Sequence, residues 1–159
     1  GLEDPGARSA LCANILVPGG AAVSSDLCVF SDADSLGLAE IAGKVELAEH
    51  YPELRAFFTS YLQVPSRLTV DDCLVALHSL QYWPQAQQQA VAIYRLLAEE
   101  YCNQPDVAVD TVYIPNEGLM ETQRCVYLEP EFEGLAELLG TVDLRPHYPE
   151  FRQCFVGNL

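Results

Sequence analysis

The chain has 159 residues, half of them apolar, and a formal net charge of −15 from 23 acidic and 8 basic side chains. A chain of this length and apolarity buries a core, which excludes a disordered tail. No apolar run reaches the roughly 20 residues that cross a bilayer. No basic stripe exists to neutralise phosphates or anionic lipids. We therefore expect neither a membrane nor a nucleic acid as a partner.

The start of the chain and the six cysteines bear on the compartment. No basic segment followed by an apolar stretch indicates a signal peptide, so we expect a cytoplasmic protein. Residues 1–10 show no apolar period, and we interpret residues 1–14 as a leader or a cloning remnant. We expect the cysteines to be small buried hydrophobic side chains in a reducing compartment rather than disulfides. They are Cys12, Cys28, Cys73, Cys102, Cys125 and Cys154.

A unit of 44 residues occurs twice in the chain. A shift of 97 positions aligns Ile15–Phe58 with Val112–Phe155 without a gap, and 16 of the 44 aligned positions are identical. Typical residue usage gives about 3 identities by chance. The chain is therefore interpreted as an internal repeat.

Both copies predict the same order of elements. Each opens with a short β-rich run, followed by a turn containing proline and glycine or asparagine and then by a second run, which together indicate a β-hairpin. The paired runs are Ile15–Val17 with Leu27–Phe30, and Val112–Ile114 with Cys125–Leu128.

A short helix is expected next, over residues 36–42 or 133–139. It ends at Gly43 or Gly140, where glycine enters the left-handed region at no steric cost. After a stretch of alternating apolar residues, Pro52 or Pro149 marks the start of a further helix, because proline lacks only an N–H that the first turn does not use.

Residues 59–111 predict a helical connector between the copies. Thr69 and Asp72 form a capping-box-like start, and the apolar stripe behind them indicates a helix that stops at Trp83-Pro84. A longer helix is predicted over residues 85–101, followed by a loop at residues 103–106. The fold class is therefore α+β. Copies at residues 15–58 and 112–159 are joined by a central helix pair, and we expect them to share one core.

The most prominent candidate site is a four-residue signature present in both copies. A histidine near a glutamate is capable of acid–base work or of metal binding. The alternative is structural: the tyrosine packs under the helix, the proline and glutamate start it, and the histidine is exposed. We favour the structural interpretation. The signature comprises His50, Tyr51, Pro52, Glu53, His147, Tyr148, Pro149 and Glu150.

Other chemistries lack their required spacing. The cysteines and histidines are too scattered for zinc, no nucleophile motif or phosphate-binding glycine loop occurs, and we expect no cofactor. Asp32 and Asp34 resemble the start of a calcium loop, but the glycine and the terminal glutamate of such a loop are not at the required positions. Cys28 and Cys125 occupy equivalent strand positions, which favours packing over catalysis.

The order of motifs resembles the sacsin-like proteins, in the segments that follow their GHKL-type ATPase modules. The resemblance is carried by Tyr51–Phe58, by the Leu-Gln-Val-Pro break at residues 62–65 and by Leu68–Leu77, and it extends over most of residues 15–155. Gln63 stands where that family often has glycine. The resemblance implies a chaperone-like or scaffold context in which nucleotide binding belongs to another part of the protein.

These patterns predict a module that is not an enzyme. We expect a non-catalytic protein-interaction or scaffold module of a large multidomain, chaperone-like protein, and we expect its partner to be a protein. The acidic composition leaves two interpretations open: a solvated surface, or a surface that binds a basic partner. Two alternatives stay open at this point. One is an enzyme domain with a site between the copies that uses His50, His147 or a cysteine, and the other is a structural module that forms oligomers.

Overall fold

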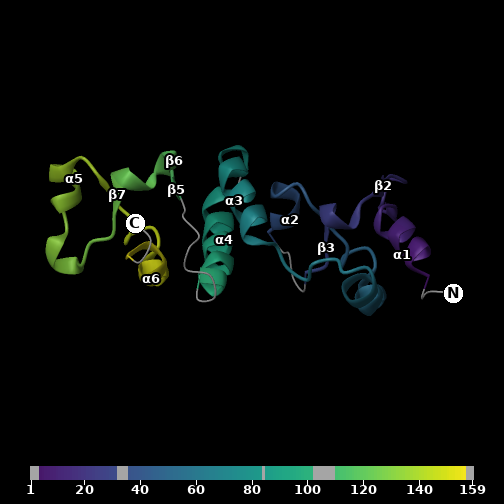
Figure 1. The fold of residues 1–159 in the computed structure, drawn as a ribbon. Coiled ribbons are helices and arrows are strands. Elements are labelled where there is room, and N and C mark those ends of the chain that lie inside the picture. The colour runs from purple at the N-terminus through teal and green to yellow at the C-terminus, as the bar shows by residue number, and fades with distance from the viewer. Residues whose placement is uncertain (1–3, 32–35, 84, 102–109, 157–159) are drawn as a thin grey trace. The chain divides into compact units, whose positions relative to one another are not determined.

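The computed structural model describes residues 4–31, 36–83, 85–101 and 110–156, and it mixes helices with short strands (Figure 1). The predicted α+β class is confirmed. Some predictions lie outside the described residues. They concern Asp32, Asp34, Pro84, Cys102, the side chain of Cys154 and the loop at residues 103–106. The chain forms two compact units, Gly1–Asp72 and Cys73–Leu159, so the unit boundary falls inside the predicted connector.

The first unit holds the first copy and the segment before it. Helix α1 lies where a leader was predicted, because Asp4 accepts a hydrogen bond from the Gly6 N–H at 3.0 Å and Pro5 occupies the first turn. The elements are α1 (Pro5–Cys12), β1 (Ile15–Leu16), β2 (Ala22–Val23), η1 (Ser25–Leu27), β3 (Cys28–Val29), α2 (Leu38–Ile41), β4 (Val45–Glu46), η2 (Pro52–Leu54), the π-helical turn η3 (Phe57–Tyr61) and the first turn of α3 (Val70–Ser79).

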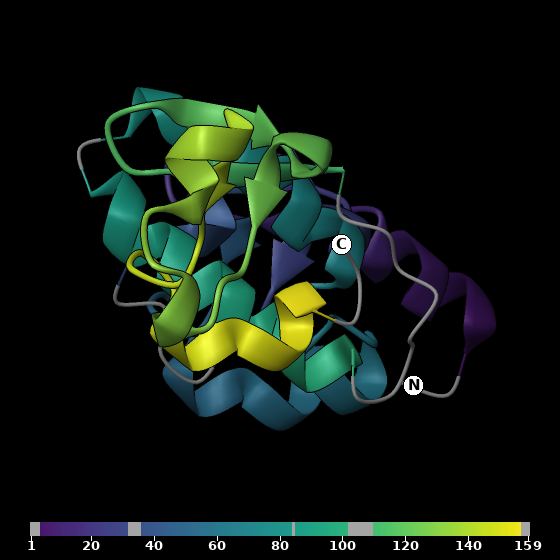
Figure 2. The ribbon, with the colours of Figure 1, turned by 90° about the vertical axis from the view of Figure 1, so that its left-hand side faces the viewer.

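The second unit holds the rest of α3 and the second copy. Its hairpin β5–β6 is drawn in green and its last helix α6 in yellow (Figure 2). The elements are η4 (Leu80–Tyr82), α4 (Ala86–Tyr101), β5 (Thr111–Ile114), β6 (Gly118–Glu121), η5 (Thr122–Arg124), β7 (Cys125–Val126), η6 (Pro130–Phe132), α5 (Leu135–Leu139), β8 (Val142–Asp143), η7 (Pro149–Phe151) and α6 (Arg152–Val156).

The strand pairing differs from the predicted hairpins. The first run pairs antiparallel with an intervening strand, β1 with β2 and β5 with β6. The second predicted run instead pairs in parallel with the stretch after the short helix, β3 with β4 and β7 with β8. The hairpin is therefore shorter than predicted. The second run forms a strand–helix–strand unit of its own, because the helix between the two strands allows the parallel return.

The registers of the two copies agree at every pair that both contain. Ile15 lies opposite Val23 as Val112 lies opposite Met120, and Cys28 lies opposite Val45 as Cys125 lies opposite Val142. The shift of 97 positions found in the sequence is thus also the shift of the backbone hydrogen-bond pattern.

Several local predictions are confirmed. Thr69 and Asp72 cap α3 reciprocally, with the Thr69 N–H donating to the Asp72 carboxylate at 3.0 Å and the Asp72 N–H donating to Thr69 Oγ1 at 3.2 Å. Gly43 and Gly140 have φ of 73° and 65°. Pro52 and Pro149 each open a short 3₁₀ turn.

Each unit buries its own cluster of apolar side chains. In the first unit the cluster joins the hairpin, β3 and the segment after the copy, and its buried members are Ile15, Val17, Cys28, Phe30, Leu47, Phe58, Leu62 and Val64. In the second unit Tyr94 of α4 packs edge-on against Tyr148, with ring centroids 4.9 Å apart, and against Phe155 at 5.3 Å. The prediction of one core shared by both copies stays a prediction.

Candidate functional site

The signature segments are reached by the same backbone path in both copies. The N–H of Leu47 donates to the Val29 carbonyl of β3 at 2.9 Å, and the N–H of Leu144 donates to the Val126 carbonyl of β7 at 2.8 Å. The carbonyl of the same leucine then accepts the N–H of Tyr51 or Tyr148, at 2.8 Å in each case. This tight turn places the tyrosine immediately before the proline that starts the 3₁₀ turn.

The tyrosine is the framework residue of the signature. The Tyr51 hydroxyl donates to the Leu16 carbonyl at 2.8 Å, and the Tyr148 hydroxyl donates to the Tyr113 carbonyl at 2.5 Å. Residues 16 and 113 are equivalent positions of the first strand. Burial, with Tyr94 and Tyr113 adding to it, raises the pKa of Tyr148 far above its ordinary value. The phenol is therefore a neutral donor that ties the signature to the hairpin.

The histidines and glutamates of the signature do not form a common cluster. His50 is exposed, and the His147 ring lies 6.4 Å from the Tyr148 ring between centroids. Glu150 lies 3.6 Å from Arg95, and both side chains are mostly exposed, which makes the pair weak. Among the described residues, no group of three potential metal ligands comes together.

A pair of acidic residues outside the signature also serves both copies. One oxygen of Glu46 accepts the N–H groups of Ser31 and Ala48, at 3.1 and 2.9 Å. One oxygen of Asp143 accepts those of Leu128 and Arg145, at 3.2 and 3.0 Å. Each acid thus brackets two backbone segments: the residue after the first strand of the parallel pair and the turn after the second strand. The sequence analysis missed this bracket. Its signal was that an acidic residue follows the shared valine in both copies, Glu46 after Val45 and Asp143 after Val142.

The equivalent cysteines are buried thiols in the first strands of the parallel pairs. Burial raises the pKa of Cys28 to about 11, and burial also raises the pKa of Cys125. Cys12, Cys28 and Cys125 are free thiols. A thiol with a raised pKa holds little thiolate near neutral pH, which disfavours a nucleophile at either strand position.

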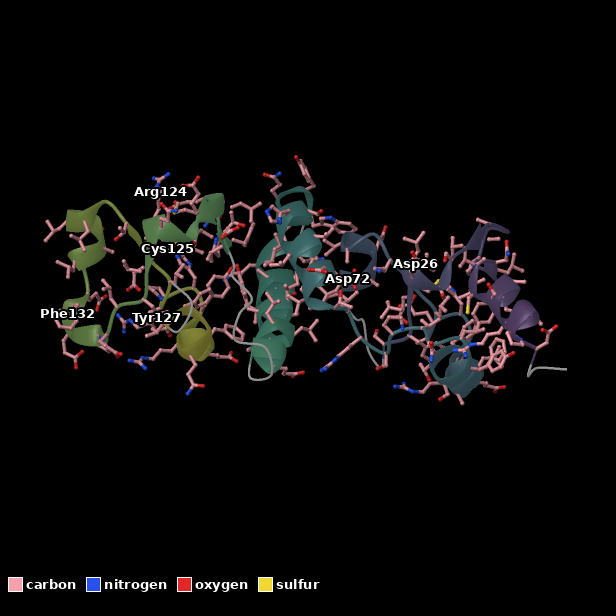
Figure 3. All side chains as sticks on the ribbon, in the orientation of Figure 1. Asp26, Asp72, Arg124, Cys125, Tyr127 and Phe132 are labelled. Atoms are coloured by element: carbon pink, nitrogen blue, oxygen red, sulfur yellow. The ribbon has the colours of Figure 1, made fainter. Side chains whose placement is uncertain are left out.

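Tyr127 joins the parallel strands of the second unit to its last helix. Its side chain points toward α6 (Figure 3), and its hydroxyl donates to the Pro149 carbonyl at 3.0 Å. Its ring stacks on Phe155 with centroids 6.4 Å apart. Tyr127 thus binds the backbone of Pro149, the proline of the signature in the second copy.

The first unit contains an open pocket of about 670 Å³ beside α1. The Arg8 guanidinium lies over the Tyr61 ring, 5.7 Å from its centroid, at one side of this pocket. None of the lining side chains is buried, and the pocket brings together only one acid and one base. The pocket therefore has no arrangement of groups that acid–base or nucleophilic catalysis needs. Its lining consists of Asp4, Pro5, Arg8, Ser9, Cys12, Tyr61 and Gln63.

Comparison of the chain with protein-family models, curated proteins and solved structures finds no match. In the part of the chain that the structure describes, no helix has the length and apolarity needed to cross a membrane. The resemblance to sacsin-like proteins stays a prediction.

Proposed function

We propose that this chain is a non-catalytic interaction or scaffold module of a large, multidomain, chaperone-like protein of the cytoplasm, related to the sacsin-like proteins. The observation that carries the proposal is the duplicated framework. Tyr51 and Tyr148 are bound to backbone carbonyls at equivalent positions, and Glu46 and Asp143 to backbone N–H groups. These four side chains are thus occupied in holding the fold.

The exposed apolar side chains support binding to another protein. Leu16 and Leu54 of the first unit are 60% and 46% exposed. An apolar side chain that is surrounded by solvent gains free energy when a partner covers it. The formal charge of −15 supports a partner with basic groups beside its apolar contacts.

Site-specific photo-crosslinking of the intact protein in cell extract tests this function. A photoreactive phenylalanine analogue replaces Leu16 or Leu54, and the same analogue at the exposed Glu40 is the matched control. We expect discrete crosslinked proteins from the first two positions and not from the control. The yield should fall at higher ionic strength, because salt screens attraction to an acidic surface. The absence of any discrete product from both leucine positions would overturn the proposal.

A further inference from the structure

Helix α4 covers one face of the second copy, and its contacts show what that face binds. The helix packs against β5 and against the 3₁₀ turn η7. The Tyr94 hydroxyl of α4 accepts the N–H of Tyr113 in β5 at 3.0 Å. The Tyr94 ring lies edge-on to Tyr148, with centroids 4.9 Å apart, and 6.2 Å from the ring of Phe151 in η7.

An ion pair at the same face adds a charged contact. The Arg95 guanidinium of α4 lies 3.6 Å from the Glu150 carboxylate, and both side chains are mostly exposed. Such a pair contributes little to affinity, but it favours one orientation of the helix. The face of the second copy therefore takes a helix in which an arginine follows a tyrosine.

The first copy has the counterparts of these groups. The tyrosine and the glutamate are identical in the two copies, as Tyr51 and Glu53, and Leu54 replaces a phenylalanine. Leu16 aligns with Tyr113, and its carbonyl accepts the Tyr51 hydroxyl as the Tyr113 carbonyl accepts the equivalent hydroxyl. We define the η2 face as Leu16, Tyr51, Glu53 and Leu54.

The backbone of Leu16 offers the same hydrogen bond that β5 gives to α4. The Val17 N–H donates to the Ala21 carbonyl at 2.9 Å, and only alternate pairs of an antiparallel ladder exchange hydrogen bonds. The pair of Leu16 and Ala22 is therefore one without them, so the Leu16 N–H points away from β2. In the part of the chain that the structure describes, no group accepts this N–H.

The η2 face is open, whereas the equivalent face of the second copy is covered. Leu54 is 46% exposed, but the phenylalanine at its position in the second copy is 6% exposed. Helix α1 precedes the first copy as α4 precedes the second. Its residues Arg8 and Cys12 contact residues 61–62, and this leaves Leu16 and Leu54 exposed to solvent.

We infer that the η2 face is the docking surface for an amphipathic helix with the chemistry of α4. Such a helix has a tyrosine whose hydroxyl accepts the Leu16 N–H, and next to it an arginine that pairs with Glu53. One turn before and after the tyrosine it has a small and an apolar residue, as α4 has the buried Ala90 and Leu97. The inference rests on the proposed interaction function and names the class of its partner.

A synthetic peptide of residues 86–101, with blocked ends, is the probe, and the full chain is its target. The chain's own α4 stays on the second copy, because a tethered segment outcompetes a free one. We expect the peptide to shift the NMR resonance of the Leu16 amide and to slow its hydrogen exchange. The amide of Leu138 is the internal control, because Leu138 is an exposed leucine of the second unit and should not respond.

Two variant peptides test the named contacts. Tyr94→Phe removes the oxygen that accepts the N–H, so the peptide should bind about fivefold more weakly. Arg95→Glu should weaken binding about threefold, because it places two carboxylates together at Glu53. Glu53→Arg in the chain should restore the affinity of that second peptide and not of the first.

Leu54→Glu in the chain should abolish binding, because the helix would bury a carboxylate without a partner. Leu138→Glu is the matched control, and it should leave the affinity unchanged. Both leucines are exposed, so the fold should tolerate both substitutions.

The inference is overturned if the Leu16 amide does not respond to the peptide, or if Tyr94→Phe binds as tightly as the parent. An equal response of the Leu138 amide would also overturn it, since the peptide would then bind any exposed leucine. A shift of the Leu16 amide in the chain alone, as protein concentration rises, would make a second copy the occupant and contradict the inference.

Photo-crosslinking separates this inference from the proposed function. Crosslinked proteins from Leu16 that the peptide does not displace would leave the proposed function standing and contradict the helical occupant. Peptide binding without any crosslinked protein from Leu16 or Leu54 would overturn the proposed function alone.

Discussion

The tyrosines of the signature allow a matched comparison of one hydrogen bond in two environments. Tyr148→Phe removes a hydroxyl that donates at 2.5 Å to the Tyr113 carbonyl, on a side chain that is 1% exposed. The N–H of the same Tyr113 donates to the Tyr94 hydroxyl at 3.0 Å, so two phenols hold this strand residue. Tyr51→Phe removes the equivalent bond to Leu16, where the tyrosine is only partly buried.

The expected magnitudes follow from access to water. A buried acceptor that loses its donor costs about 1–3 kcal/mol, whereas a bond that water can replace contributes about 0.5–1 kcal/mol. We therefore expect Tyr148→Phe to lower the free energy of unfolding of its unit by about 2 kcal/mol, and Tyr51→Phe to lower that of the first unit by less than about 1 kcal/mol.

Urea unfolding separates the two effects. The one tryptophan, Trp83, lies in the second unit, so its fluorescence should show the shift caused by Tyr148→Phe. Circular dichroism reports both units. Tyr82→Phe is the control, because Tyr82 is 80% exposed and its loss of a hydroxyl should leave the midpoint unchanged. Equal losses from the two signature tyrosines, or no loss from Tyr148→Phe, would refute the framework role.

Three further outcomes are expected. Gln63 has φ of 58°, so Gln63→Gly should raise the free energy of unfolding by up to about 1 kcal/mol in urea titrations, whereas Gln63→Val should lower it, and a loss with glycine would contradict this. Ile41→Ala should cost about 2–4 kcal/mol by the same measurement and Leu138→Ala less than about 0.5 kcal/mol, so similar losses would argue against the burial difference. The thiol pKa of Cys28 is raised from 9.0 to about 11, so the unfolded chain releases this proton first and stability should fall as pH rises across that interval. Cys28→Ala should reduce this pH dependence of the free energy of unfolding. An unchanged slope against pH would contradict the raised pKa of Cys28.

Local chemistry made much of the fold predictable. Thr69 and Asp72 have the spacing of a reciprocal cap, and such a cap depends only on neighbours in sequence. The same holds for Gly43 and Gly140, whose positive φ follows from the helix ends that they terminate. Features set within four or five residues were therefore visible in the sequence, and they account for the start of α3 and the ends of α2 and α5.

Strand pairing was not predictable in the same way. Ala22–Val23 is a strand of two residues without a β-rich run, and it pairs because the turn after Val17 returns the chain beside β1. Strand β3 pairs with β4, which follows α2 in the chain. Which strand pairs with which depends here on packing rather than on the β propensity of the residues. Helix α1 was missed for another reason: Asp4-Pro5 is a good helix start, but the exposed helix behind it has no buried stripe to reveal it.

The interaction or structural role of the signature stays a prediction, and the structure adds contacts that its spacing does not encode. The expectation that the tyrosine packs beneath a helix start agrees with the buried Tyr148. Its bond to the first strand required the three-dimensional return of the chain, which no spacing in the signature encodes. The bonds that Glu46 and Asp143 accept from Ser31 and Leu128 were hidden for the same reason, since each joins residues 15 positions apart.

The two copies also differ in which apolar face is covered, and this difference bears on how a repeat works as a scaffold. Phe151 is 6% exposed because Tyr94 of α4 lies against it, whereas its counterpart Leu54 is 46% exposed. At the short helix the order is reversed, with Ile41 buried and Leu138 exposed. Each repeat unit thus has two apolar faces, one at the 3₁₀ turn and one at the short helix, and each copy covers only one of them. In the function we propose, the open face of each copy is the surface on which another segment binds without refolding of the unit. This is the physical requirement for extending an array of repeats or recruiting a partner to it.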